Sequence, residues 1–305
     1  MMNNDLIIVT GPTATGKTQF AIDLAMAFNG EIISADSRQV FRGMDLGTGK
    51  DLSEYANGTQ PIPYHLIDIL DAGDKYSVYR FQRDFLNAYY DIKKRGKNAI
   101  LCGGTGLYIE SIVRNYQMPD VPENKELRKS LRKKSLEELT QILSTLKQLH
   151  NTTDVDTCNR AIRAIEIAVF ENENPESIVP FPKLSCLVFG VHFERETIRK
   201  RITERLKQRI DQGMILETKK LLDAGVKAEV LISYGLEYKF TTWLLQDKIT
   251  NDEFFTGLNT AIHQFAKRQM TWFRRMERNG IEIHWIDGTL SPREKVAKVS
   301  LIING

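Results

Sequence analysis

A glycine-rich segment near the amino terminus constrains the fold more than any other part of the sequence. It comprises Gly11, Pro12, Thr13, Ala14, Thr15, Gly16, Lys17 and Thr18. The segment follows the β-branched run 6–10 and precedes apolar residues at helical spacing over 20–28, so it joins a predicted strand to a predicted helix. In this setting the pattern GxxxxGK[ST] predicts a phosphate-binding loop, or P-loop, whose backbone N–H groups point inward at phosphate oxygens.

Three features of this P-loop suit a bound di- or triphosphate. Lys17 supplies a point charge, the Thr18 hydroxyl can bind Mg²⁺, and the following helix adds the positive end of its dipole. We therefore expect residues 11–18 to bind a diphosphate group and Thr18 to be a metal ligand. The loop alone does not say whether the phosphate belongs to ATP.

Further strands alternate with helical stretches along the chain. They are predicted at 31–36, 64–70, 98–102, 184–193 and 281–286. This order predicts an α/β fold, a P-loop NTPase-like doubly wound parallel sheet. Ligands of such sheets bind beyond the carboxyl ends of the strands. The residues to inspect are therefore 11–18, 36–37, 68 and 103–106.

The segment 115–183 differs in character from the rest of the chain. It holds five of the nine prolines, lacks clear strands and contains amphipathic stretches such as 135–149. We expect a helical insertion domain over 115–183. Residues 1–114 and 184–305 would then form the P-loop catalytic core.

Composition excludes several classes of protein. The chain has 305 residues, 42% hydrophobic and 27% charged, which are values typical of soluble globular proteins. No uncharged apolar run approaches the roughly 18 residues that cross a bilayer, and residues 1–5 lack signal-peptide features. The three cysteines lie far apart without zinc-ligand spacing. We expect a cytoplasmic protein with no membrane partner, while a net charge of +3 neither requires nor excludes nucleic acid.

Two aspartates that follow predicted strands are candidates for phosphate chemistry. A P-loop enzyme needs a carboxylate that organises Mg²⁺ and a residue that positions the attacking group. Asp68 suits the first role, and Asp36, which ends the strand after the P-loop helix, is a second candidate. Each has a structural alternative, because aspartate also stabilises turns and caps helices.

The sequence also resembles a known family in several blocks that occur in the same order. The P-loop is followed by SADSRQVFRGMDLGT at 34–48, and further matching blocks lie at 64–68, 76–81, 103–108, 160–166 and 266–274. Together they resemble the bacterial tRNA dimethylallyltransferase (IPP transferase) family over nearly the whole chain. The chain departs from the family pattern at 156–160 and 233–239.

The resemblance implies a prenyl transfer. The dimethylallyl group of dimethylallyl diphosphate would move to the exocyclic N6 amine of the adenosine 3′-adjacent to the anticodon in tRNA, releasing diphosphate. The P-loop would then hold a leaving group, with Mg²⁺ as the cofactor. By this resemblance the catalytic residues are Asp36, Thr105, Lys17 and Arg205. Asp36 would accept the proton of the amine, and Thr105 would orient the substrates unless its hydroxyl only caps the next helix.

Three arginines, Arg201, Arg205 and Arg209, recur every fourth residue beside an apolar stripe. They therefore lie along one face of a predicted helix. From spacing alone such a face is most simply solvated. By its position in the block, Arg205 resembles the family arginine that reaches the diphosphate, where a planar guanidinium suits phosphate oxygens.

Candidate tRNA contacts fall in two places. Short polar side chains after the second strand suit the reading of a flipped adenine, and the pair Arg160 and Arg163 shares one face of a predicted helix. The full set comprises Asp36, Ser37, Arg38, Gln39, Thr105, Asn159, Arg160, Ala161, Ile162 and Arg163. Basic clusters at 125–134 and 267–278 could track RNA phosphates or form solvated faces, and Trp272 and Phe273 are expected to pack in a core.

Two other functions remain open from the sequence. In a small-molecule kinase the same loop would hold ATP, and Asp36 would activate a hydroxyl group. In a nucleotide-gated RNA-binding module the loop would be a conformational switch. We expect tRNA and dimethylallyl diphosphate as partners and a monomeric chain.

Overall fold

The computed structural model describes residues 4–56, 61–147, 155–177 and 180–304. The chain forms two compact units. The first, which we call the core unit, consists of Met1–Arg114 and Lys183–Gly305. The second, which we call the helical unit, is Asn115–Pro182.

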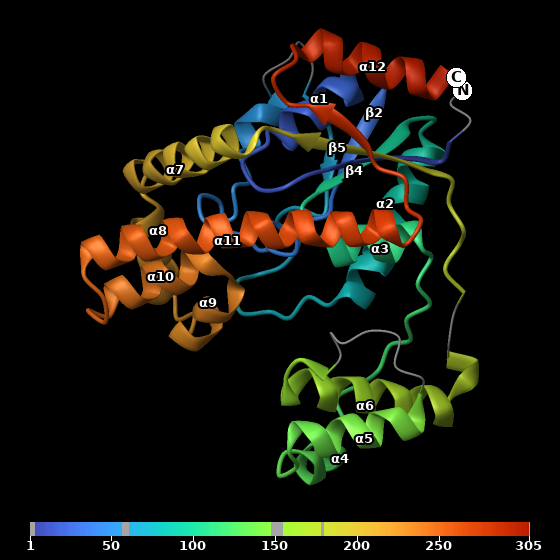
Figure 1. Cartoon of the computed structure of the whole chain (residues 1–305), viewed down its shortest axis with the longest axis vertical. Coiled ribbons are helices and arrows are strands. Elements are labelled where there is room, and N and C mark those ends of the chain that lie inside the picture. The colour runs from blue at the N-terminus through green and yellow to red at the C-terminus, as the bar shows by residue number, and fades with distance from the viewer. Residues whose placement is uncertain (1–3, 57–60, 148–154, 178–179, 305) are drawn as a thin grey trace. The chain divides into compact units, whose positions relative to one another are not determined.

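A six-stranded parallel sheet forms the centre of the core unit (Figure 1). In spatial order its strands are β3 (Tyr64–His65), β2 (Gly30–Ser34), β4 (Asn98–Gly103), β1 (Leu6–Thr10), β5 (Cys186–His192) and β6 (His284–Asp287). All five residues of β1 are buried, as its apolar run predicts for a strand that is covered on both faces. The predicted doubly wound P-loop fold is confirmed.

The strand order places the site. Outward from β1, the chain builds β2, β3 and β4 on one side and β5 and β6 on the other. In open α/β sheets, ligands bind outside the carboxyl ends of the strands where the order reverses. The carboxyl end of β1 runs directly into the P-loop, so this loop lies at the reversal.

Helices cover both faces of the sheet (Figure 1). One face carries α1 (Lys17–Ala27) and α12 (Pro292–Asn304), and the other carries α2 (Val78–Lys94), α3 (Gly106–Val113) and α11 (Asn251–Arg278). The remaining elements of the core unit are η1 (Leu52–Ala56), α7 (Arg195–Asp211), α8 (Met214–Asp223), α9 (Ala228–Tyr234) and α10 (Leu236–Leu245). Within the described ranges, none of the helices has the length and apolarity that crossing a membrane requires.

The long helix α11 shows how the apolar pattern fixes packing. It starts at a capping box, in which Thr250 and Glu253 satisfy each other's backbone N–H groups. Its buried side recurs every three or four residues, which matches the helical period. That side consists of Phe254, Leu258, Ile262, Ala266, Gln269, Phe273 and Met276. One polar residue, Gln269, therefore occupies a core position.

The third strand is shorter than predicted. The mostly apolar segment 64–70 predicts a full strand, but β3 ends at His65. Leu66 and Asp68 adopt positive φ angles of 62° and 55°, and this left-handed backbone cannot continue a strand. The chain turns here, and Asp68 binds the buried ammonium group of Lys50.

The helical unit contains α4 (Lys125–Leu131), α5 (Leu136–Leu146), α6 (Cys158–Glu173) and the short η3 (Pro175–Ser177). No strand occurs among its described residues. Ser135 begins α5 with a capping box, as expected from the predicted stretch 135–149, of which residues 148 and 149 lie outside the described residues. Leu131, Leu139 and residues of α6 form its apolar core.

A buried carboxylate ties α4 to α6. Glu166 accepts hydrogen bonds from Arg128 at 2.7 and 2.9 Å, from the backbone N–H of Asn124 at 2.6 Å, and from Arg163. Burial alone would raise the pKa of this carboxyl, but these bonds outweigh burial and lower the pKa to about 2. The helical unit is thus held by a charged network as well as by its apolar core.

Candidate active site

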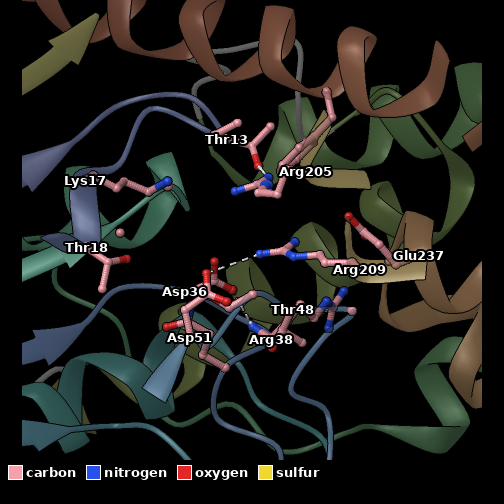
Figure 2. A pocket seen from close by; sticks show the side chains of 18 of the residues that line it. Thr13, Lys17, Thr18, Asp36, Arg38, Thr48, Asp51, Arg205, Arg209 and Glu237 are labelled. Atoms are coloured by element: carbon pink, nitrogen blue, oxygen red, sulfur yellow. Dashed lines mark hydrogen bonds and ion pairs between the residues drawn. The ribbon is translucent and has the colours of Figure 1, made fainter. Parts of the chain in front are cut away.

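A cavity of about 520 Å³ lies at the carboxyl ends of the central strands of the core unit. The P-loop forms one wall, and the loops after β2 and β4 form another. Helix α7, the start of α10 and residues of η1, α9 and α11 contribute further parts of the lining. Figure 2 shows that the side chains of Lys17, Arg205 and Arg209 point toward the centre of this space.

Backbone geometry shapes the P-loop. Gly11 has a φ of +148°, and a Cβ there would lie 2.7 Å from the carbonyl oxygen of Val191 on β5, so only glycine fits. Thr15 donates its hydroxyl hydrogen to the carbonyl of Pro12 at 2.9 Å, which closes the loop on itself. Gly16, with a φ of +75°, leads into α1. The predicted strand, loop and helix therefore form as the sequence indicates.

The Lys17 ammonium group bends back over the P-loop, 3.4 Å from the carbonyl oxygen of Pro12. Burial lowers its pKa, and the nearby positive charges of Arg205 and Arg209 lower it further. These groups share the cavity and repel one another. An anion with several charges, bound between them, would relieve that repulsion.

Asp36 and Thr105 come together from two different strand ends. Asp36 follows β2, and its Oδ1 accepts a hydrogen bond from the backbone N–H of Arg38 at 2.9 Å. Thr105 follows β4, and its hydroxyl accepts a hydrogen bond from the backbone N–H of Ser37 at 3.1 Å. Although Thr105 stands at the N-cap position of α3, its side chain makes no capping bond. The alternative of a mere helix cap is therefore wrong, whereas the turn role of Asp36 coexists with its place in the cavity.

The next two predicted residues line the same cavity but already have protein partners. Arg38 donates to the carbonyl of Ser233 at 3.2 Å, and its guanidinium lies 5.4 Å from the ring centre of Tyr234. Gln39 donates to the carbonyl of Gly49 at 3.1 Å. These side chains therefore shape the wall that faces the P-loop.

The three arginines of α7 all line the cavity. Arg201 donates to the carbonyl of Ala14 at 2.9 Å, and Arg205 binds the hydroxyl of Thr13, both within the P-loop. Burial lowers the pKa of Arg205 to about 9, with a further contribution from Arg209. Arg201 is exposed although it contacts the P-loop, whereas Arg205 is partly buried and Arg209 is buried, so the expectation of a solvated face fails for Arg205 and Arg209. Helical spacing places them on one face but does not say that this face meets a cavity.

Among the cavity residues that the sequence analysis missed are Gln269 and Glu237. Gln269 accepts a hydrogen bond from the backbone N–H of Thr13 at 2.8 Å and donates one to the carbonyl of Gly104 at 2.9 Å. Its polar side chain at a core position of α11 is a signal that could have revealed it. Glu237, at the start of α10, faces the arginines of α7 (Figure 2). It lies in the segment 233–239, where the chain departs from the family pattern, but that departure does not single out Glu237.

Asp68 does not line this cavity. It binds Lys50, which also contacts Asp45 at 2.8 Å and the carbonyl of Phe41 at 2.6 Å. The interpretation of Asp68 as a Mg²⁺ organiser is therefore wrong. Its charge neutralises a fully buried lysine that anchors the loop after β2.

The predicted tRNA contacts of the helical unit divide by exposure. Asn159 and Arg160 are exposed, and Arg160 pairs with Asp156 at 2.9 Å. Ala161 and Ile162 are buried in the apolar core of the unit, so their predicted side-chain contacts with tRNA are corrected. Arg163 is half-buried and donates to Glu166 and to the carbonyl of Val121 at 3.0 Å.

The two basic clusters also differ. Lys125, Lys129, Arg132 and Lys133 are exposed, whereas Arg128 is committed to Glu166. In the second cluster, Phe273 is fully buried. Trp272 packs on α3 so closely that a Cβ on Gly106 would lie 2.3 Å from its ring. The prediction that these aromatic residues pack in a core is confirmed for Phe273, whereas Trp272 is only partly buried and carries the Arg275 guanidinium over its ring.

Comparison with known proteins decides the family. The family model described as IPP transferase matches residues 39–276. The chain belongs to this family. It is 58% identical to tRNA dimethylallyltransferase 2 of Bacteroides fragilis over 97% of each chain, and 55% identical to the protein of that name from Phocaeicola vulgatus over 98% of this chain and 97% of the relative. The structure of the tRNA isopentenylpyrophosphate transferase from Bacillus halodurans is similar at 31% identity, with a TM-score of 0.71, over 98% of this chain and 95% of that one.

Family membership settles the enzyme class. The resemblance stated from sequence blocks is confirmed, and the IPP transferase is a transferase of prenyl groups in tRNA modification. The kinase alternative is not favoured, because the relatives that match nearly the whole chain are named as dimethylallyltransferases.

Proposed function

We propose that the protein transfers the dimethylallyl group of dimethylallyl diphosphate to the N6 amine of the adenosine 3′-adjacent to the anticodon in tRNA. One observation carries the proposal. A single cavity brings the cationic P-loop wall, with Lys17 and Arg205, to face the wall where Asp36 and Thr105 meet. The first wall suits a diphosphate, and the second suits a nucleobase amine.

The P-loop wall stabilises the leaving group. As the bond between the allylic carbon and the diphosphate oxygen breaks, negative charge develops on that oxygen. Backbone N–H groups of residues 11–18, the ammonium of Lys17 and the guanidinium of Arg205 are the donors that would receive it. Because these donors are fixed before the reaction, the charge is stabilised without reorganisation of the site.

The opposite wall activates the acceptor. The adenine amine is a weak nucleophile, so it needs both proximity to the allylic carbon and a proton acceptor. As the new C–N bond forms, the amine hydrogen passes to the Asp36 carboxylate. Oδ1 of Asp36 is oriented by the Arg38 N–H, and among the described residues no hydrogen bond engages Oδ2. Thr105 accepts from Ser37, which leaves its own hydrogen for the substrate.

The donors present fit a Mg²⁺ ion. Thr18 lines the cavity at the start of α1 and would supply its hydroxyl, as P-loop threonines do. Within the described ranges, His, Cys, Asp and Glu residues form no group of three that could hold a metal ion. Mg²⁺ in phosphate sites takes most of its ligands from phosphate oxygens and water, so a single protein hydroxyl is sufficient. The ion would neutralise diphosphate charge.

For tRNA recognition we propose residues of both units, some of which also have protein partners. In the core unit, Asp36, Ser37, Arg38, Gln39 and Thr105 would contact the flipped adenine. In the helical unit, Asn159, Arg160 and Arg163 would contact the RNA backbone, carried on the buried residues Ala161 and Ile162. A tRNA substrate implies action in the cytoplasm, and we propose a monomer.

One experiment tests this function against both alternatives. The protein is incubated with unmodified tRNA and Mg²⁺, with either dimethylallyl diphosphate or ATP. Digestion to nucleosides and mass spectrometry then measure prenylated adenosine, and a coupled assay measures released diphosphate. We expect prenyl transfer without ATP. Phosphoryl transfer from ATP would establish a kinase, and tRNA binding without either reaction would establish a binding module.

A further inference from the structure

Arg209 is the most enclosed of the three cavity arginines. It lies one helical turn after Arg205 on α7, so the two side chains share a face. The Arg209 side chain is only 8% exposed, yet it lines the cavity and points toward its centre in Figure 2. A charge this enclosed requires a partner, because transfer of a guanidinium out of water is costly.

The protein partners of Arg209 do not match its charge well. Asp51 is the one acidic group in ion-pair range among the described residues, at 3.5 Å, and its side chain is about half exposed. Glu237 faces the same space, but burial raises the pKa of its carboxyl and favours the neutral form. Meanwhile Arg209 lowers the pKa of both Lys17 and Arg205. Glu54 lines the same cavity, but burial raises the pKa of its carboxyl as well. The charge of Arg209 is therefore compensated only in part by the acidic groups around it.

Gly49 determines where the Arg209 guanidinium lies. A Cβ at Gly49 would be 2.0 Å from Nη2 and 2.8 Å from Cζ of Arg209, so the guanidinium rests directly on the Gly49 backbone. Gly49 has a φ of +68°, a conformation that glycine adopts readily. Its carbonyl is held in turn by Gln39. The backbone of the loop after β2 thus fixes the position of this guanidinium.

We propose that Arg209 is a second diphosphate-binding arginine beside Arg205, and that Gly49 positions it. This inference rests on the proposed function, because it assigns the ligand to the same cavity. Two guanidinium groups one helical turn apart offer planar donors to different oxygens of a diphosphate. The anion supplies the charge that Asp51 and Glu237 provide only in part.

Binding of inorganic pyrophosphate with Mg²⁺, measured by titration calorimetry on the full chain, tests the role of Arg209. Charge-assisted hydrogen bonds are worth roughly 1.5–3 kcal/mol, so we expect Arg209→Met to raise the Kd about tenfold to a hundredfold. Arg209→Lys keeps the positive charge but loses the planar set of guanidinium N–H donors, so we expect a rise in Kd smaller than that of Arg209→Met. Arg199→Met is the matched control on an exposed position of α7, with a Kd within about twofold of wild type.

A double-mutant cycle tests the role of Gly49. Gly49→Ala would displace the Arg209 guanidinium without removing its charge, and we expect a clear rise in Kd. In the Arg209→Met background the same change should add almost nothing, because the guanidinium is already gone. The backbone strain of alanine at a positive φ is present in both backgrounds and cancels.

Several results would overturn the inference. One is a Kd for pyrophosphate that Arg209→Met leaves unchanged or, if that variant does not fold, that Arg209→Lys leaves unchanged. Another is a double-mutant cycle in which the losses of binding free energy from Gly49→Ala and Arg209→Met are additive. If Lys17→Ala still weakens pyrophosphate binding in that case, the proposed function stands and only the role of Arg209 falls. If the wild-type protein itself fails to bind pyrophosphate, the proposed function fails as well.

Discussion

Gln269 joins the two walls of the cavity, and its removal is a sensitive test of how they are positioned. Its side chain receives the Thr13 N–H of the P-loop at 2.8 Å and donates to Gly104, next to Thr105, at 2.9 Å. Thr105 in turn accepts from Ser37, beside Asp36. A chain of contacts thus fixes the distance between the diphosphate cradle and the proposed proton acceptor.

We predict that Gln269→Leu lowers both stability and turnover. The change leaves one backbone donor, Thr13 N–H, and one acceptor, Gly104 C=O, without partners. Each enclosed orphan group costs about 1–3 kcal/mol, so the free energy of unfolding should fall by about 2–6 kcal/mol. A misplacement of about 1 Å between reacting groups costs about a hundredfold in rate. We therefore expect kcat to fall about tenfold to a hundredfold, with little change in tRNA affinity.

Urea denaturation and single-turnover prenyl transfer at saturating substrates measure the two effects. Gln269→Glu keeps an acceptor for Thr13 but loses the donor to Gly104, so its stability loss should be smaller. Gln264→Leu changes an exposed glutamine of the same helix and should leave both quantities unchanged. The reasoning is refuted if Gln269→Leu keeps kcat within about twofold of wild type while the Gln264 variant behaves identically.

Three further predictions concern other parts of the molecule. The pKa of Glu166 is lowered from 4.5 to about 2, so ionised Glu166 adds about 3 kcal/mol to the free energy of unfolding. This contribution is complete above pH 4.5 and is lost as the pH falls toward 2. Glu166→Gln should remove this pH dependence from the acid unfolding of the helical unit. Arg160→Ala should weaken tRNA binding and lower the salt slope by about 1 in titrations at several salt concentrations, and an unchanged slope would remove Arg160 from the RNA contacts. Glu217 accepts from the backbone N–H groups of residues 45, 46 and 47 at 2.7–3.0 Å, so Glu217→Ala should expose 45–49 to proteolysis; resistance equal to wild type would count against this anchoring.

The architecture was predictable because its signals are local. The P-loop has a fixed sequence pattern between a strand and a helix, and short, mostly apolar runs predict the strands. The error at 64–70 has a physical cause. The run is mostly apolar, but Leu66 and Asp68 adopt positive φ angles, and Asp68 binds the buried ammonium group of Lys50. Composition carries no signal for such a turn.

The site was predictable only in part. The positions of Asp36 and Thr105 follow from strand ends meeting at one edge of a parallel sheet. The enclosure of Arg209 depends on which side of α7 lines the cavity. Sequence periodicity groups residues on one side of a helix but does not show what that side contacts. Gln269 was accessible in principle, because a polar residue interrupts the apolar series of α11. Glu237 has no such signal, since only tertiary folding places the start of α10 and the arginines of α7 at the same cavity.

The proton-accepting role of Asp36 is tested most directly by Asp36→Asn in a single-turnover assay with both substrates saturating. The amide retains an oxygen for the Arg38 N–H, so the turn should survive, but it cannot accept the amine hydrogen. General-base catalysis contributes about 10²–10⁴-fold, and we predict a loss of prenyl-transfer rate of at least about a hundredfold, with a tRNA Kd within about threefold of wild type. A rate equal to wild type, or a rate loss no larger than the loss of tRNA affinity, would contradict the account.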